Sequence, residues 1–473
     1  MGNSSETLPP LACFFEGQKV PLSLVIIIGN MILETEIDGL LYSLDTDEQE
    51  ATVKECVNKK PIEIAIPASF FYQGIVYRVT NIGRDAFHYC DLTAITIPES
   101  IESIGENASW MCNSLTTINI SKGVKSIGGG AFSECNSLTT ITIPESIISI
   151  GNYAFSSCNS LTAITLPGGI TNISNGLFHS CRSLTSVTLP EGVTSIGIEA
   201  FYGCHSLNSI TIPESVVSIG SWAFYGCVNL TAITIPRNVV SIGECILSDC
   251  SLTKIIVAEE NTVYDSREGC NAIIETNSNT LVVGCAKTFI PKSVTNIGDN
   301  AFHGCEGLTT IIIPESVTSI GGGAFGCCYN LTSITIPESI TNLGQWALAN
   351  CGLSTIKIPK SMMSIEDYSL FNCDNLNSIL IPKSIKCIGN GALMNSGITY
   401  LTILGKPFIY KEVFMGCKNL TDVYCYSEEI PPAEDAFGNL DLSRITLHVP
   451  ESAIETYKNT EPWSRFGAIE VIE

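Results

Sequence analysis

Cysteine is the residue type in this sequence whose abundance and spacing suggest chemistry. The 473 residues include 21 cysteines, and a large subset recurs at nearly constant intervals. These ladder cysteines are Cys90, Cys112, Cys135, Cys158, Cys181, Cys204, Cys227, Cys250, Cys305, Cys328, Cys351, Cys373 and Cys417. Cysteines in such numbers form disulfides, hold metal ions or serve as small apolar side chains in a core. The spacing favours the third of these roles.

Successive ladder cysteines such as Cys135, Cys158 and Cys181 are 23 residues apart. If each occupies the same place in a stack of coils, neighbouring thiols point the same way at a separation of ~4.8 Å. Their Cβ atoms are then further apart than the ~3.8 Å that a disulfide prefers. A metal site would need converging C-x-x-C pairs or histidines; the sequence has no C-x-x-C pair beside these cysteines, and its five histidines are scattered. We therefore expect buried free thiols, with no metal and no cofactor.

The ladder cysteines belong to a longer repeat. Residues 138–160 read LTTITIPESIISIGNYAFSSCNS, and Leu161 begins the next copy, LTAITLPGGITNISNGLFHSCRS. Alternation in L-x-x-I-x-I predicts a strand with one buried face, and the proline that follows it ends the pairing in every coil. A second apolar pair, such as Val193 and Ile196, ends in a glycine that we expect at a corner with positive φ. Alanine, phenylalanine and the ladder cysteine follow at fixed positions, and we expect their side chains to lie in the core.

Repetition is the means by which such a chain closes its core. One coil is too small to bury its own apolar face, whereas stacked coils bury each leucine, isoleucine and phenylalanine against its copy. The pattern predicts about fifteen coils in a parallel solenoid on the order of 70 Å long. We expect a parallel β-sheet on one side and short turns or 3-10 segments on the other.

The full pattern, L-x-x-I-x-I-P-x-x-V-x-x-I-G-x-x-A-F-x-x-C, resembles the BspA-like class of leucine-rich repeats over residues 77–426. EIDGLLYSLD, residues 36–45, resembles the leading strand pair of such proteins, and YKNTEPWSRFGAIEVIE, residues 457–473, resembles their closing cap. The resemblance implies capping strands over 36–76 and a C-terminal cap over 427–473. It also implies a secreted or surface protein of a host-associated microbe, a group in which some members are adhesins.

Residues 1–35 form an irregular N-terminal segment that contains an apolar run at 20–33. This run has the length of a signal-peptide core and is too short to span a membrane comfortably. A secretion signal and an apolar strand packed on the first coil both remain open. The net charge of −23 gives no electrostatic footprint for nucleic acid.

The repeat is interrupted once, at residues 258–289. NAIIET and TLVVGC flank Asn277-Ser278-Asn279, which predicts a hairpin projecting from the stack. A turn between Asn277 and Ser278 would bring Cys270 and Cys285 opposite each other. A disulfide between them and two half-buried thiols are the alternatives.

Signs of catalysis are lacking in the sequence. His88, His179 and His303 share a column two residues before the ladder cysteine, and other coils carry serine, tyrosine or glycine there, which is typical of a surface position. No nucleophile elbow, metalloprotease helix, P-loop or dinucleotide fingerprint occurs. Glutamates follow the strand prolines, and the adjacent pairs Glu191/Glu214 and Glu315/Glu338 could meet a calcium ion; we expect a solvated ridge instead, because no Asp-rich loop completes the ligand set. We therefore expect a protein that is not an enzyme.

Exposed aromatic residues provide the candidate ligand-binding site. Tyr202, Trp222 and Tyr225 are expected to cluster on adjacent coils, and such rings concentrate interface energy. They would serve a non-enzymatic, adhesin-like scaffold, secreted or at the cell surface, whose partners are host or microbial surface proteins. The alternatives are rings that merely cover the coil corner, ice or crystal binding through the column Thr142, Thr165, Thr188, Thr211 and Thr234, and a purely structural surface-layer role. Asn119, Ile256, Lys357 and Leu380 interrupt that threonine column.

Overall fold

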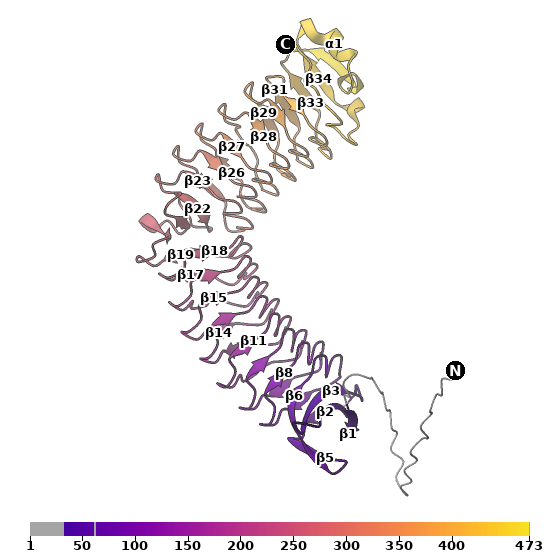
Figure 1. Cartoon of the computed structure of the whole chain (residues 1–473). Coiled ribbons are helices and arrows are strands. Elements are labelled where there is room, and N and C mark those ends of the chain that lie inside the picture. The colour runs from indigo at the N-terminus through magenta and orange to yellow at the C-terminus, as the bar shows by residue number, and fades with distance from the viewer. Residues whose placement is uncertain (1–32, 61–62, 473) are drawn as a thin grey trace, which may run out of the picture.

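The computed structural model describes residues 33–60 and 63–472. They form an elongated, curved stack of coils with β1 at one end and α1 at the other (Figure 1). Apart from Leu33, the apolar run 20–33 lies outside the described residues. The parallel solenoid of 23-residue coils predicted from the repeat is confirmed.

In the part of the chain that the structure describes, no helix is long and apolar enough to cross a membrane.

The L-x-x-I-x-I segments form a first parallel ladder. Its strands pair in register, so that Ile164 lies opposite Val187 and Thr165 opposite Thr188. The middle isoleucine points into the core and the threonines point outward. The strands of the first ladder are β4 (Glu63–Ala65), β7 (Ala94–Thr96), β9 (Thr117–Asn119), β12 (Ala163–Thr165), β14 (Ser186–Thr188), β17 (Ala232–Ile235), β19 (Lys254–Val257), β24 (Thr310–Ile312), β26 (Ser333–Thr335), β29 (Ser378–Ile381), β31 (Tyr400–Ile403), β33 (Asp422–Cys425), β34 (Thr446–Val449) and β35 (Ala468–Val471).

The second apolar pair of each coil forms a second parallel ladder, which the sequence pattern did not predict. Its strands are mostly two residues long, and Ile127 pairs with Ile150 and Ile104 in the adjacent coils. Such strands are too short for alternation to be seen in the sequence. They are β8 (Ser103–Ile104), β10 (Ser126–Ile127), β11 (Ser149–Ile150), β13 (Asn172–Ile173), β15 (Ser195–Ile196), β16 (Ser218–Ile219), β18 (Ser241–Ile242), β23 (Asn296–Ile297), β25 (Ser319–Ile320), β27 (Asn342–Leu343), β28 (Ser364–Ile365), β30 (Cys387–Ile388) and β32 (Phe408–Ile409).

The Ala-Phe segments form short turns on the third side of each coil, and these turns are also bonded from coil to coil. The amide of Phe155 donates to the carbonyl of Leu177 at 3.1 Å, and that of Phe178 to Ala200 at 2.9 Å. The predicted short turns are therefore present. Among the described residues, 3-10 helices occur outside the regular coils: η1 (Arg267–Gly269), η2 (Leu442–Arg444), η3 (Glu451–Ala453) and η4 (Trp463–Arg465).

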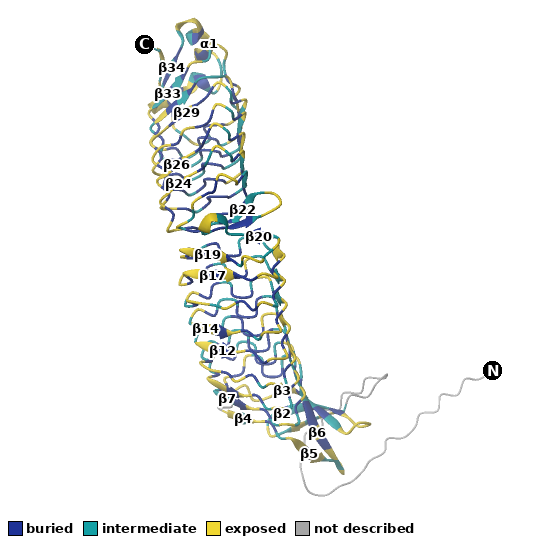
Figure 2. Cartoon of the chain, turned by 90° about the vertical axis from the view of Figure 1, so that its left-hand side faces the viewer, coloured by how far each residue is buried: buried dark blue, intermediate teal, exposed yellow. Residues whose placement is uncertain are grey.

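Buried segments run along the inside of the stack from coil to coil (Figure 2), and phenylalanine and cysteine columns fill the core on the turn side. Phe178, Phe201 and Phe224 stack in sequence, with ring centroids 5.5 and 5.3 Å apart. The thiol of Cys204 donates to the carbonyl of Phe178 at 3.1 Å, and the same bond recurs from Cys227 to Phe201. All ladder cysteines are buried free thiols, as predicted. The cysteine thus fills a small apolar site and also donates to a buried carbonyl.

The glycine column that ends the second ladder does not have positive φ, so our prediction for it is wrong. A Cβ added to Gly105 would lie 2.6 Å from the backbone of Gly83, and one added to Gly220 would lie 2.6 Å from the amide nitrogen of Ile198. Glycine is present because adjacent coils approach closely there. Positive φ values occur two residues later, immediately before the Ala-Phe pair, and again immediately before the ladder cysteine.

The insertion forms a hairpin that joins the second ladder. Its strands are β20 (Tyr264–Asp265), β21 (Ile273–Glu275) and β22 (Thr280–Val283); β22 pairs with β23 in parallel. Ile273 and Val283 pack into the core on the N-terminal side, and Ile274 and Leu281 into the core on the C-terminal side. Cys270 and Cys285 are buried free thiols and form no disulfide. Their sulfurs face different carbonyls, those of Ala272 and Asn271.

Different elements cover the two ends of the stack. Trp463 is buried at the C-terminal end, where its indole donates to the carbonyl of Pro431 at 3.1 Å, and Tyr457 packs against it edge-on. Both rings close an apolar surface that has no further coil to cover it. The remaining elements of the two ends are β1 (Leu33–Ile37), β2 (Leu40–Asp45), β3 (Glu50–Cys56), β5 (Ser69–Tyr72), β6 (Ile75–Ile82) and α1 (Ile454–Lys458).

Removing one ring from the phenylalanine column should leave a cavity that neighbouring coils cannot fill. We expect Phe224→Ala to lower the free energy of unfolding by about 3–5 kcal/mol, measured in denaturant melts. Ile148→Ala, at an exposed position, is the control and should cost little. A loss below about 1 kcal/mol for Phe224→Ala would contradict the stacked assignment.

Burial should also protect the ladder thiols from reagents. Burial raises the pKa of Cys158 and Cys204 well above the usual thiol value, so neither forms thiolate in the folded protein. We expect both to resist iodoacetamide in native protein and to react after unfolding, as followed by peptide mass spectrometry. Rapid alkylation of Cys158 in native protein would show that the cysteine column is not interior.

Candidate binding surface

A column of left-handed residues runs along the turn side of the solenoid. This left-handed column is the position just before the alanine of each Ala-Phe pair. Gly176, Gly323 and Gly391 occupy it in some coils, with φ near +60°. Aromatic residues occupy it in others: Tyr153, Trp222, Trp346 and Tyr368, with φ of 57°, 56°, 60° and 53°. A left-handed conformation is costly for bulky residues, by roughly 1–2 kcal/mol each.

Side chains of the left-handed column lean toward the following coil. The ring of Tyr153 lies over Gly176 and faces His179, at 6.1 Å between centroids. Trp346 stacks on Tyr368 at 4.3 Å and meets Phe371 edge-on at 5.4 Å. Each partner belongs to the next coil, so Tyr153 and Trp346 each overlap a ring one coil further along the stack.

The candidate site residues are arranged differently from the expected three-ring cluster. Tyr202 stacks on Tyr225 at 4.9 Å with an interplanar angle of 5°, and His179 stacks on the other face of Tyr202 at 4.7 Å. Within the described part of the chain, Trp222 has no ring contact, because it leans toward the following coil and lies beside Cys245. Its side chain is 39% exposed.

Polar partners orient the rings of this region. The hydroxyl of Tyr153 donates to Glu199 at 3.0 Å, and the same carboxylate lies 3.9 Å from the imidazole of His179. Burial, together with a hydrogen bond to Asp249, raises the pKa of Tyr225. The phenol of Tyr225 is therefore a hydrogen-bond donor at neutral pH. The histidine column is thus partly stacked and ordered rather than simply exposed.

The structure adds a second aromatic cluster that the sequence analysis did not propose as a site. It consists of Trp346, Tyr368 and Phe371. Trp346 is 43% exposed, comparable to Trp222. The sequence analysis missed this cluster because it did not anticipate that the ring of Trp346 leans toward the next coil. There the ring meets residues 22 and 25 positions further along the chain.

The strand side offers less aromatic area. The threonines of the expected column are exposed, but Ile312, which is 77% exposed, interrupts their row in addition to the residues already named. On the ridge, Glu214 pairs with Arg237 at 3.6 Å and Glu338 with Lys357 at 2.8 Å. Residues 33–60 and 63–472 contain no cluster of three or more acidic, histidine or cysteine side chains that could hold a metal ion.

An apolar groove lies on the strand side near the C-terminal coils. Its volume is about 560 Å³, and its walls include Ile356, Leu380 and Leu404. Its rim carries three lysines, Lys357, Lys360 and Lys383. Lys357 is paired with Glu338, so Lys360 and Lys383 are the rim lysines that leave local positive charge on a chain with a net charge of −23.

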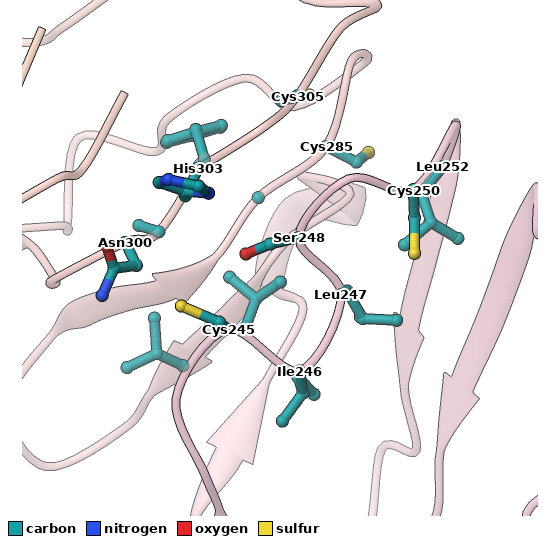
Figure 3. Close-up of a pocket in the computed structure, with 15 residues that line it drawn as sticks. Cys245, Ile246, Leu247, Ser248, Cys250, Leu252, Cys285, Asn300, His303 and Cys305 are labelled. Carbon is teal, nitrogen blue, oxygen red and sulfur yellow. The ribbon is translucent and has the colours of Figure 1, made fainter. Parts of the chain in front are cut away.

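The coils on either side of the insertion leave a small cavity between them. Figure 3 shows Cys245, Ser248 and Cys250 of one coil facing Cys285, His303 and Cys305 across a small cavity. Its volume is about 20 Å³, which is room for about one water molecule. A larger hollow of about 480 Å³ opens next to it, lined by His303, Cys327 and Trp346 among others.

Comparison with known proteins identifies the family of this repeat and solved structures that are similar to it. The family described as the BspA type leucine rich repeat region (6 copies) matches residues 80–208, 194–275, 274–352, 295–421 and 344–459. No curated protein matches the chain. Solved structures do match, and the following ones cover nearly the whole chain.

A leucine rich cell surface protein from Faecalibacterium prausnitzii is 26% identical, with a TM-score of 0.53, and the match covers 94% of this chain and 96% of that protein. A leucine-rich repeat protein from Bacteroides ovatus is 26% identical, with a TM-score of 0.56 and coverage of 93% and 100%. The pneumococcal vaccine antigen PcpA shares the fold at 18% identity and a TM-score of 0.50, with coverage of 93% and 99%. Since the family match extends from residue 80 to residue 459, this chain belongs to the BspA type leucine-rich repeat family.

Proposed function

We propose that this protein is a non-enzymatic scaffold that binds other proteins through the aromatic rings of its turn side. The observation that carries the proposal is the presence of Trp222 and Trp346 in left-handed backbone positions while about two fifths of each side chain is exposed. Glycine would be less strained at both positions. Residues held in costly conformations without full burial are typical of functional surfaces.

The two clusters have the composition of interface hot spots. Tryptophan and tyrosine contribute much of the binding energy at protein interfaces, and the stacked pairs Tyr202/Tyr225 and Trp346/Tyr368 are already ordered by their neighbours. Preordered rings lose little conformational entropy on binding. The solenoid therefore presents rigid anchors along one side rather than a single pocket.

We place the protein at the cell surface or among secreted proteins. The support is its 26% identity over almost its full length to a protein described as a leucine rich cell surface protein. The partners proposed are host or microbial surface proteins. Binding of ice or crystal surfaces has weaker support because Ile312 and Leu380 break the threonine row with large exposed apolar side chains.

The proposal is tested by removing Trp222, which stands apart from the stacked pairs, and Trp346, which belongs to the second cluster. Immobilised wild-type protein is incubated with extracts of host cells and of neighbouring microbes, and each captured partner is then titrated against variants. Trp222→Ala or Trp346→Ala should weaken binding by about 2 kcal/mol or more, because hot-spot rings dominate the interface. The melting temperature should stay nearly unchanged, since neither ring belongs to the buried core.

Two variants serve as comparisons. Ile148→Ala removes an exposed apolar side chain outside the aromatic clusters and should leave binding unchanged. Lys383→Glu reverses a charge at the rim of the apolar groove and identifies a partner bound there instead. If both tryptophan variants bind normally and melt much earlier, the rings serve corner packing and the proposal is wrong.

A further inference from the structure

The thiol of Cys327 lies outside the cysteine column. Cys327 immediately precedes the ladder cysteine Cys328 and has a left-handed backbone, with φ of 58°. Gly304 and Asn350 occupy the same position in the preceding and following coils. Cys328 points into the core and is fully buried, whereas Cys327 is half-buried on the surface of the turn side.

Polar side chains from three coils surround the sulfur of Cys327. The amide of Asn350 donates to it at 3.6 Å, and the side chains of His303 and Tyr329 interact with it from the preceding and the same coil. The Nδ1 atom of His303 is shielded from solvent and has no hydrogen-bond partner among the described residues. The imidazole of His303 thus lies beside the thiol, and its Nδ1 atom has no hydrogen bond to another described residue.

The electrostatics of this group differ from those of the other half-buried cysteines. Interaction with His303 lowers the pKa of Cys327, and Cys327 in turn raises the pKa of His303. Burial raises the pKa of the half-buried thiols Cys245 and Cys387. A thiol beside a protonated histidine carries more thiolate at neutral pH, and the thiolate is the reactive form.

Cys327 also opens into space that a reagent can enter. The hollow that it lines measures about 480 Å³, and Trp346 is also among its lining residues. The other titratable and charged groups around it are Glu244 and Asp299 on the walls, Asp249 facing His303, Tyr225 beyond Asp249, and Tyr329 with its neighbour Glu306. Asp249 favours the protonated form of His303, and the interaction with His303 favours the thiolate of Cys327.

We propose that Cys327 is a reactive thiol site, assisted by His303, that forms mixed disulfides with low-molecular-weight disulfides. The Cys327 thiolate attacks one sulfur of the small disulfide, so that a new S–S bond forms as the old one breaks. The departing thiolate takes the proton of the His303 imidazolium and leaves as a thiol. The cysteine is oxidised and one half of the small disulfide is reduced, with no other oxidant required. This inference does not depend on the protein-binding role.

The test uses the full-length, fully reduced protein and oxidised glutathione as the probe. Native protein is sampled over time at several pH values, unreacted thiols are trapped with acid, and fragmentation of the peptides by mass spectrometry assigns the modified residue. We expect Cys327 to be modified at least about tenfold faster than Cys245 and Cys387 at pH 6, since a tenfold difference in thiolate corresponds to about one pKa unit. The rate advantage should shrink as the pH rises and the other thiols ionise.

Variants separate assistance by His303 from simple exposure. His303→Gln should slow modification of Cys327 by about tenfold at pH 6 and move its pH–rate profile upward, while His179→Gln, in the same column, should change neither. Cys327→Ser should abolish the fast phase with an unchanged circular dichroism spectrum. Equal rates for Cys327, Cys245 and Cys387 in the wild-type protein, or an unchanged rate in folded His303→Gln, would overturn the proposal.

Discussion

Each coil of this protein is too small to have a core of its own, so its apolar side chains are buried only by the same side chains of the coils above and below. The phenylalanine stack shows this directly, with Phe201 between Phe178 and Phe224. Close stacking also requires glycine where backbones meet, as at Gly105 and Gly220. It makes the small cysteine suitable next to the phenylalanine column, where its thiol satisfies a carbonyl of the preceding coil.

The insertion is the place where this constraint is relaxed. The hairpin of β21 and β22 supplies one apolar face to each half of the solenoid through the neighbours Ile273 and Ile274. A two-faced hairpin cannot reproduce the shape of a regular coil, and a small cavity remains between Cys245 and His303. The residues with unusual electrostatics, His303 and Cys327, lie at this junction. The proposed reactive thiol thus lies where the repeat is least regular.

The coil corner separates stability from surface chemistry. Every regular coil has a left-handed residue before its alanine. The side chain at this position lies at the surface and leans toward the next coil, so the residue type can vary. Glycine satisfies the backbone at the lowest cost, whereas Trp222 and Trp346 accept strain and place an aromatic ring at the surface. The same scaffold can therefore carry different surfaces without changes to its core.

The repeat by itself determined the solenoid, the inward-facing isoleucines and phenylalanines, and the free state of the ladder cysteines, because a fixed period allows only one way for these residues to bury each other. Tertiary structure decided the second ladder, the reason for the glycines and the partners of the surface rings. Two-residue strands such as Ser126–Ile127 carry no periodic signal, and the role of Gly105 depends on the backbone of another coil. The lean of the left-handed column toward the next coil separates Trp222 from Tyr202 and Tyr225, and the same stacking brings His303 to Cys327. These contacts join different coils at distances set by the geometry of the stack, which no single repeat contains.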